Sequence, residues 1–243
     1  LDPNAVRRDE VEGSTYKKVV REMRKNPFFL KEQSIMEKKG LIQVRPSFDV
    51  SATREQCIAA PPIAKAYDLI TNSVFEGSRN NKYYVFGWSG LLSQKRRRKE
   101  AVRLYNSLIE ERDKLIDLGF EPKIRIISHS HGGNLVLNLG GLRDAMDGEW
   151  NTLPEENNEE FLPIKNDFKA LLNSLPKKEI AMVRGEQKRF DYFPDKPLLI
   201  DEFIMLGAPI QPETAYFARS NTFGLVCNIY SDEDRVQELD FIS

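Results

Sequence analysis

One run of the chain, "KIRIISHSHGGNLVLNLGG" at residues 123–141, limits the choice of fold more than any other. Residues 123–130 contain isoleucines at positions 124, 126 and 127 and predict a strand. Two glycines and a second apolar run follow, and residues 132–146 predict a helix. A strand that enters a helix after one tight turn is typical of a βαβ unit, so this run indicates an α/β protein.

Other segments repeat this alternation of strand and helix. Apolar runs at residues 82–88, 198–209 and 224–231 predict three more strands, and the amphipathic run at 93–120 predicts one long helix. Strands that alternate with helices are typical of parallel sheets. We therefore expect an α/β fold with a doubly wound, mainly parallel sheet in residues 81–243.

Two segments do not follow this alternation. Residues 1–80 are charged and helix-prone at first, then irregular and proline-containing, and predict an N-terminal helical extension packed on the core, with a helix at 63–75. Residues 147–197 form a stretch too long for a plain connection. They predict a lid-like insertion above the strand ends, with a short helix at 168–175, although its first half also fits a surface loop.

Composition excludes several classes of protein. Lys+Arg 36 against Asp+Glu 37 leaves a net charge of −1, which gives no support for a nucleic-acid partner or a general binder of anionic membranes. No apolar run reaches the ~18–20 residues of a membrane span, and no signal peptide is visible, which favours a soluble, cytoplasmic protein. The two cysteines, Cys57 and Cys227, are too few for a disulfide framework. One bridge between them is an alternative, but we expect free, buried thiols.

The turn between the predicted strand and helix has a distinctive order of small residues and histidines: Ser128, His129, Ser130, His131, Gly132. This order resembles the G-x-S-x-G nucleophile elbow of the α/β-hydrolase fold, and "SHSHGGN" is closest to its lipase and carboxylesterase branches. The elbow needs small residues two before and two after the nucleophile, because the strand and the helix would otherwise collide. Gly132 meets this demand, Gly133 allows close helix packing, and Ser128 replaces the usual first glycine. A glycine-rich turn with a capping serine, as in nucleotide-binding folds, is the alternative.

The resemblance covers roughly residues 82–236 without the insertion, and it implies a serine hydrolase. The substrate would be a lipid or small-molecule ester, Ser130 would form an acyl-enzyme, and neither a cofactor nor a metal is implied. The backbone amide of His131 would be one oxyanion donor. In "YVFGWSGLLS" the second donor would be Trp88 or, as the less favoured choice, Ser89.

The same resemblance places the catalytic acid in "VCNIYSDEDRVQ". A carboxylate at the tip of that strand would orient the imidazole of the base and stabilise its charged form. Asp234 fits the family's placement best, and Asp232 is its close competitor.

The base is the unsolved part of this interpretation, since the chain has only two histidines, His129 and His131. Adjacent side chains of a strand project to opposite faces, so His129 should turn away from Ser130, into the packing beside the sheet or toward a polar neighbour. His131 should offer its amide rather than its ring. In this family the histidine follows the acid, and we favour a histidine beyond Ser243. A degenerate hydrolase that acts as a binding or scaffold module, or an unusual base such as His131 or a lysine, remain as alternatives.

Five successive cations, Lys95–Lys99, lie beside the predicted oxyanion loop. They fit a solvated helix face, or else a surface that attracts a phosphorylated, acidic or membrane-bound substrate and allows peripheral membrane contact. The pair His129 and His131 has no cysteine or carboxylate nearby at ligand spacing, so no metal site is expected.

Overall fold

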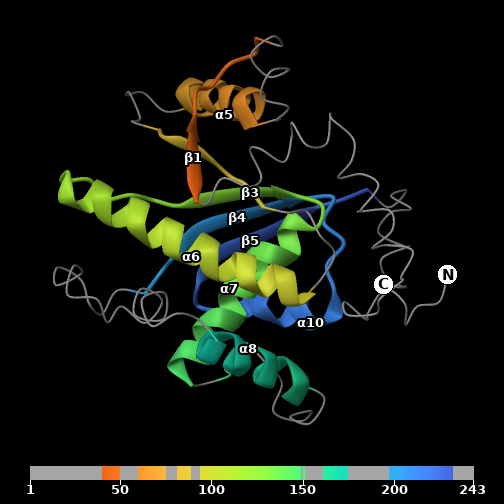
Figure 1. Ribbon diagram of the computed structural model, residues 1–243. Helices are drawn as coiled ribbons and strands as arrows, with labels where there is room; N and C mark the ends of the chain where they lie inside the picture. Colours follow the sequence, from red (N-terminus) through yellow and green to blue (C-terminus); the bar gives the residue numbers. More distant parts are fainter. Residues whose placement is uncertain are drawn as a thin grey trace, which may run out of the picture. The chain divides into compact units, whose positions relative to one another are not determined.

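The computed structural model describes seven parts of the chain, namely residues 40–49, 60–74, 81–88, 94–148, 150, 161–174 and 197–231 (Figure 1). These residues belong to two compact units, one that holds the described residues up to Trp88 and one that holds those from Gln94 onward. The sequence placed this boundary at residue 80 instead. Predictions for the N-terminal helices before residue 40 lie outside the described residues.

The first unit contains two short strands and a helix. Strand β1 (Leu41–Val44) pairs antiparallel with strand β2 (Tyr83–Phe86), with Leu41 opposite Phe86 and Val44 opposite Tyr83. The sequence interpretation of residues 41–80 as irregular missed β1. Helix α5 (Ala60–Val74) begins three residues before the predicted start, because the two prolines after Ala60 fit the first turn, where the missing N–H groups have no helical partner.

Tyr83 joins β2 to α5 in this unit. Its hydroxyl donates a hydrogen bond to Oδ1 of Asp68 over 2.8 Å, and its ring meets that of Tyr67 edge-on. Burial and the hydrogen bond to Asp68 raise the pKa of Tyr83 to about 12.

The second unit contains a three-stranded parallel sheet in the order β3-β4-β5. Its strands are β3 (Arg125–His129), β4 (Ile200–Leu206) and β5 (Phe223–Ile229). The register places Ile127 beside Ile204 and Ile204 beside Cys227. The predicted mixture of helices with a parallel sheet is therefore present in the described residues, whereas the doubly wound hydrolase arrangement stays a prediction.

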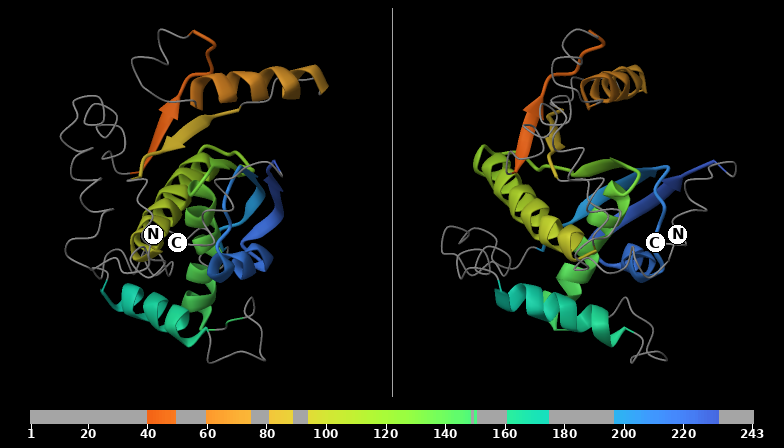
Figure 2. Two further views of the ribbon diagram at one scale, coloured as in Figure 1. Left: turned by 90° about the vertical axis from the view of Figure 1, so that its right-hand side faces the viewer. Right: turned by 45° about the vertical axis from the view of Figure 1, so that its right-hand side comes forward.

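Helices connect these strands and cover one face of the sheet. They are α6 (Gln94–Asp117), α7 (Gly132–Asp147), α8 (Leu162–Ser174) and the short α10 (Pro212–Ala215), which continues as a 3-10 turn at Tyr216–Arg219. Helices α6 and α7 lie on the same side of the sheet in both views of Figure 2. Phe203 and Met205 of β4 are buried on that side.

The opposite face of the sheet is exposed. Ile127, Leu225 and Ile229 point to this side and are 38%, 57% and 55% exposed. Cys227 is a free, exposed thiol of the same face, so the expectation of a buried thiol is wrong for Cys227, while Cys57 lies outside the described residues. The reason is its register, which aligns Cys227 with the outward Ile204 rather than with the buried Met205.

Helix α8 is the described part of the predicted insertion, and it begins six residues before the expected start at 168. Phe168 is completely buried, and its ring meets that of Phe217 edge-on, with centroids 5.8 Å apart. A Cβ atom on Gly141 of α7 would come within 2.8 Å of both rings, so the bare backbone allows this contact. The helix thus packs on the helical layer, and a lid role for the insertion stays a prediction.

Candidate active site

Ser130 lies in the tight turn between β3 and α7, and its backbone is strained. Its φ is 52°, and it is the one non-glycine residue with a positive φ in the described part of the chain. The backbone is held on both sides: the Ser130 N–H donates to the carbonyl of Leu206 over 3.1 Å, and the Ser130 carbonyl accepts from the Gly133 N–H over 2.9 Å. Strain of this kind costs about 1–3 kcal/mol and persists only where the surrounding structure enforces it.

The two glycines after the turn fit the predicted packing. A Cβ atom on Gly132 would lie 3.5 Å from Cβ of Ser128, so the residues two before and two after Ser130 face each other. A Cβ atom on Gly133 would lie 2.7 Å from Cβ of Ala208 and 3.1 Å from Sδ of Met205. The absence of a side chain at Gly133 therefore lets α7 approach β4 closely, as the sequence predicted.

His131 caps the start of α7, and its ring faces α6. Its Nδ1 lies 3.2 Å from Nη1 of Arg97. A guanidinium only donates hydrogen bonds, so Nδ1 must be the acceptor and the proton of the neutral ring lies on Nε2. This arrangement argues against His131 as the base, and the role of its amide as an oxyanion donor stays a prediction.

His129 is exposed at the end of β3. The sequence predicted that this side chain points either into the packing beside the sheet or toward a polar neighbour. The first of these two predictions is wrong. The physical reason is strand alternation, since His129 lies on the same face as the exposed Ile127, two residues before it. Its ring consequently lies on the open face of the sheet.

A buried polar network behind the turn was not predicted. Asn134 of α7 is completely buried, its Oδ1 accepts from the Gln211 N–H and the Thr214 hydroxyl, and its Nδ2 donates to the carbonyl of Pro209. These bonds join the first turns of α7 to the loop that follows β4. The available signal was Asn134 itself, a polar residue within an apolar helical run, because buried amides need partners.

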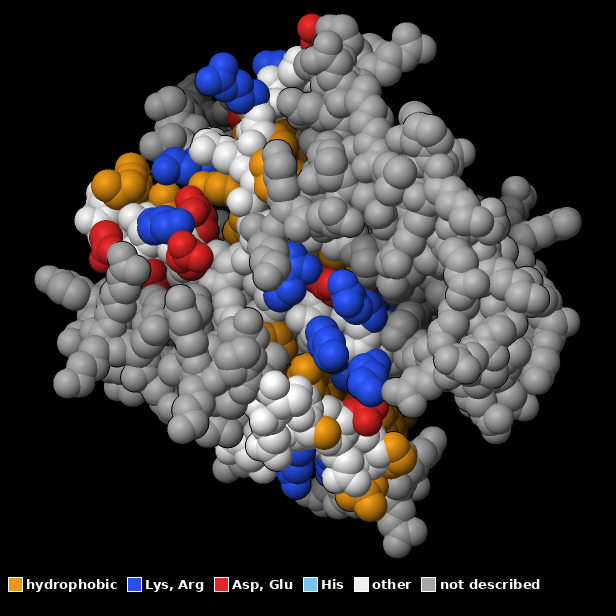
Figure 3. All heavy atoms as spheres, viewed as in Figure 1, with side chains coloured by type: hydrophobic (Ala, Val, Ile, Leu, Met, Phe, Trp, Pro, Cys, Tyr) orange, Lys and Arg blue, Asp and Glu red, His pale blue; other side chains and the backbone are white. Residues whose placement is uncertain are grey.

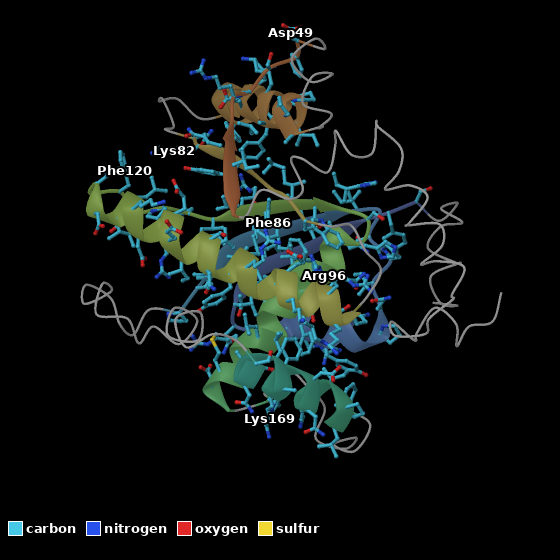
Figure 4. The ribbon with its side chains drawn as sticks, viewed as in Figure 1. Asp49, Lys82, Phe86, Arg96, Phe120 and Lys169 are labelled. Atoms are coloured by element: carbon cyan, nitrogen blue, oxygen red, sulfur yellow. The ribbon has the colours of Figure 1, made fainter. Side chains whose placement is uncertain are left out.

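The five cations at the start of α6 divide into two groups. Arg97 and Arg98 are buried, and Arg98 pairs with Asp167 of α8. Lys95, Arg96 and Lys99 are exposed, and basic side chains gather over α6 in Figure 3, with Arg96 labelled in Figure 4. The solvated-face interpretation is therefore wrong for the two buried arginines, because helical periodicity turns them toward α7 and α8. Attraction of an acidic substrate or membrane surface stays a prediction.

The remaining predicted site residues stay predictions from the sequence. Trp88 is half-buried but belongs to the first compact unit, so its pairing with the His131 amide stays a prediction. Ser89, Asp232 and Asp234 lie outside the described residues.

Two further properties concern metals and membranes. Within the described ranges, no three His, Cys, Asp or Glu side chains gather as metal ligands would. Among the helices that the structure describes, none combines the length and apolarity needed to cross a bilayer.

Comparison with models of known families, with curated proteins and with solved structures found no match to this chain.

Proposed function

We propose that the protein is a serine hydrolase that cleaves ester bonds of a lipid or small acyl ester, with Ser130 as its nucleophile. The observation that carries this proposal is the positive φ of Ser130 at the junction of a parallel strand and a helix. Strained backbone is concentrated at functional sites, where it helps to present a side chain. A strand–turn–helix with a strained serine at its apex is the arrangement that exposes a nucleophile at the edge of a sheet.

The residue type at this position supports the proposal further. Glycine adopts a positive φ without strain, so a turn with a purely architectural role would be more stable with glycine at position 130. The chain instead has a hydroxyl-bearing residue there, between two positions where the packing accepts small residues, Ser128 and Gly132. This favours a chemical use of the hydroxyl over the alternative of a glycine-rich turn in a nucleotide-binding fold.

The proposed reaction follows from these positions. The Ser130 oxygen attacks the acyl carbon, its proton passes to a histidine other than His129 and His131, and the alcohol leaves with that proton. Water then attacks the acyl-serine and releases the acid. Amides at the start of α7, with that of His131 first, face the developing negative charge, where the positive end of the helix dipole also lies. Asp234, with Asp232 as the alternative, would hold the histidine.

Labelling with a fluorophosphonate probe tests the proposal. The full-length protein should be labelled at one site, which peptide mass mapping should assign to Ser130, and Ser130→Ala should abolish the labelling. The matched control is Ser107→Ala, because Ser107 lies in the regular part of α6 and its hydroxyl bonds the carbonyl of Arg103 over 2.8 Å. This variant should label like the wild type.

The same samples separate the two functional hypotheses. A hydrolase should also release the alcohol from short and long acyl esters in a Ser130-dependent manner. If folded, full-length wild type neither reacts with the probe nor turns over any ester, the enzyme proposal is overturned. The alternative of a degenerate hydrolase that acts as a binding or scaffold module would then stand.

A further inference from the structure

A completely buried arginine links three elements beside Ser130. Arg97 of α6 has an exposed fraction of 0%, its Nη1 lies 3.2 Å from Nδ1 of His131, and its Nη2 donates to Oε1 of Gln211 over 2.8 Å. Gln94, one turn earlier on α6, donates to the same oxygen of Gln211. The guanidinium thus contacts both the start of α7 and the loop after β4.

The two partners of Arg97 are themselves tied together. The backbone N–H of Gln211 donates to Oδ1 of Asn134 over 3.0 Å, and Asn134 lies one turn after His131 on α7. Arg97, Gln211 and Asn134 therefore hold the first two turns of α7 from two directions. A rigid support of this kind is what fixes a reacting group to within a fraction of an ångström.

Burial of a guanidinium is unfavourable unless its hydrogen bonds are made, and an apolar side chain of similar size is often at least as stable in such a place. The planar fork of Arg97 is also suited to holding two partners at once, which a lysine cannot do in the same way. Arg97 is therefore better explained by the geometry it imposes than by general stability.

We propose that Arg97 is a positioning residue of this site: it holds the His131 ring as the Nε2–H tautomer and thereby fixes the backbone that follows Ser130. The effect on reactivity rests on the proposed hydrolase function. The effect on the His131 ring does not, so the two can be tested separately.

Nuclear magnetic resonance of the imidazole nitrogens tests the first part on the wild-type protein. The variants His131→Gln and His129→Gln each remove the signals of one ring and so assign the signals of both histidines. His131 should be a single Nε2–H tautomer, whereas the exposed His129 should show the mixture of tautomers typical of a solvated ring. A predominant Nδ1–H tautomer at His131 would overturn the proposal.

Two buried arginines, adjacent in the sequence, provide a matched pair of variants. Arg97→Met removes the guanidinium that contacts His131. Arg98→Met removes a buried arginine that pairs with Asp167 and lies over the ring of Phe168. Arg97→Met should convert His131 to a tautomer mixture and slow fluorophosphonate labelling of Ser130 roughly 10–100-fold, as expected for a misplaced reacting group. Arg98→Met should change neither.

The outcomes are decisive in each case. Equal behaviour of Arg97→Met and Arg98→Met in both measurements contradicts the proposal. If Arg97→Met does not fold, Arg97→Lys takes its place, since a point charge can keep one contact and should give an intermediate tautomer ratio. If the wild type does not label while the His131 tautomer depends on Arg97, the positioning role holds and the hydrolase function fails.

Discussion

The positive φ of Ser130 makes a prediction about stability that needs no substrate. Ser130→Gly and Ser130→Ala both remove the hydroxyl, but only alanine keeps a Cβ atom in the left-handed region. For an L residue that conformation costs roughly 1–2 kcal/mol. Glycine avoids this strain but loses more chain entropy on folding, which offsets about 0.5–1 kcal/mol of the gain. We expect Ser130→Gly to be more stable than Ser130→Ala by about 0.5–1 kcal/mol.

The same pair of substitutions at Ser107 provides the control. Ser107 lies inside the regular helix α6, where alanine is favoured over glycine by about 1 kcal/mol. The sign of the difference should therefore reverse between the two positions. Urea and thermal unfolding followed by circular dichroism measure it, and a difference of 1 kcal/mol corresponds to roughly 2–4 °C in Tm for a chain of this length. Equal or greater stability of Ser130→Ala relative to Ser130→Gly would refute the strained turn.

Three further predictions concern packing, the buried amide and pH. Gly133→Ala should lower the free energy of unfolding by about 1–3 kcal/mol, because its Cβ atom would lie 2.7 Å from another side chain. Gly132→Ala should be tolerated, because its nearest neighbour would be 3.5 Å away. Urea unfolding should find Gly133→Ala the less stable of the two, and equal stability would contradict the close approach of α7 to β4. Asn134→Ala should cost roughly 2–4 kcal/mol in the same assay, since it leaves buried partners without hydrogen bonds, and a neutral effect would show that the network is not formed. Tyr83 has a folded pKa of about 12, above the unfolded value of about 10, so its contribution to stability should be complete below pH 10 and lost as the pH rises from 10 to 12. Wild type should therefore lose more stability over this range than Tyr83→Phe, and parallel losses would argue against the hydrogen bond to Asp68.

Long periodic elements were predictable from the sequence, and short ones were not. The apolar stripe of α6 and the strand–turn–helix around Ser130 have their signals within one continuous run, so their type was predicted and their ends differ by only a few residues. Strand β1 has four residues and is paired with a strand some forty positions later. Local propensity contains little information about such a pairing, which is why β1 was interpreted as irregular.

In the candidate site, too, some features were predictable from the sequence and others were not. The pattern around Ser130 predicted the tight turn and the small residues on either side of it. The contacts of Arg97 and Asn134 with Gln211 join residues more than seventy positions apart, and they depend on how α6, α7 and the loop after β4 pack. The predicted Asp234, Asp232 and Ser89 remain sequence predictions.

The sequence by itself determined that residues 123–141 form a strand, a tight turn and a helix, because side-chain size and hydrophobic periodicity act over a few neighbouring residues. Only the tertiary structure decided which cations of Lys95–Lys99 are exposed and which side of the sheet carries His129 and Cys227. Burial depends on what packs against a residue from elsewhere in the chain, and that information is not local. The strain at Ser130 depends on both, since the local turn requires it and the packing of Gly133 against β4 enforces it.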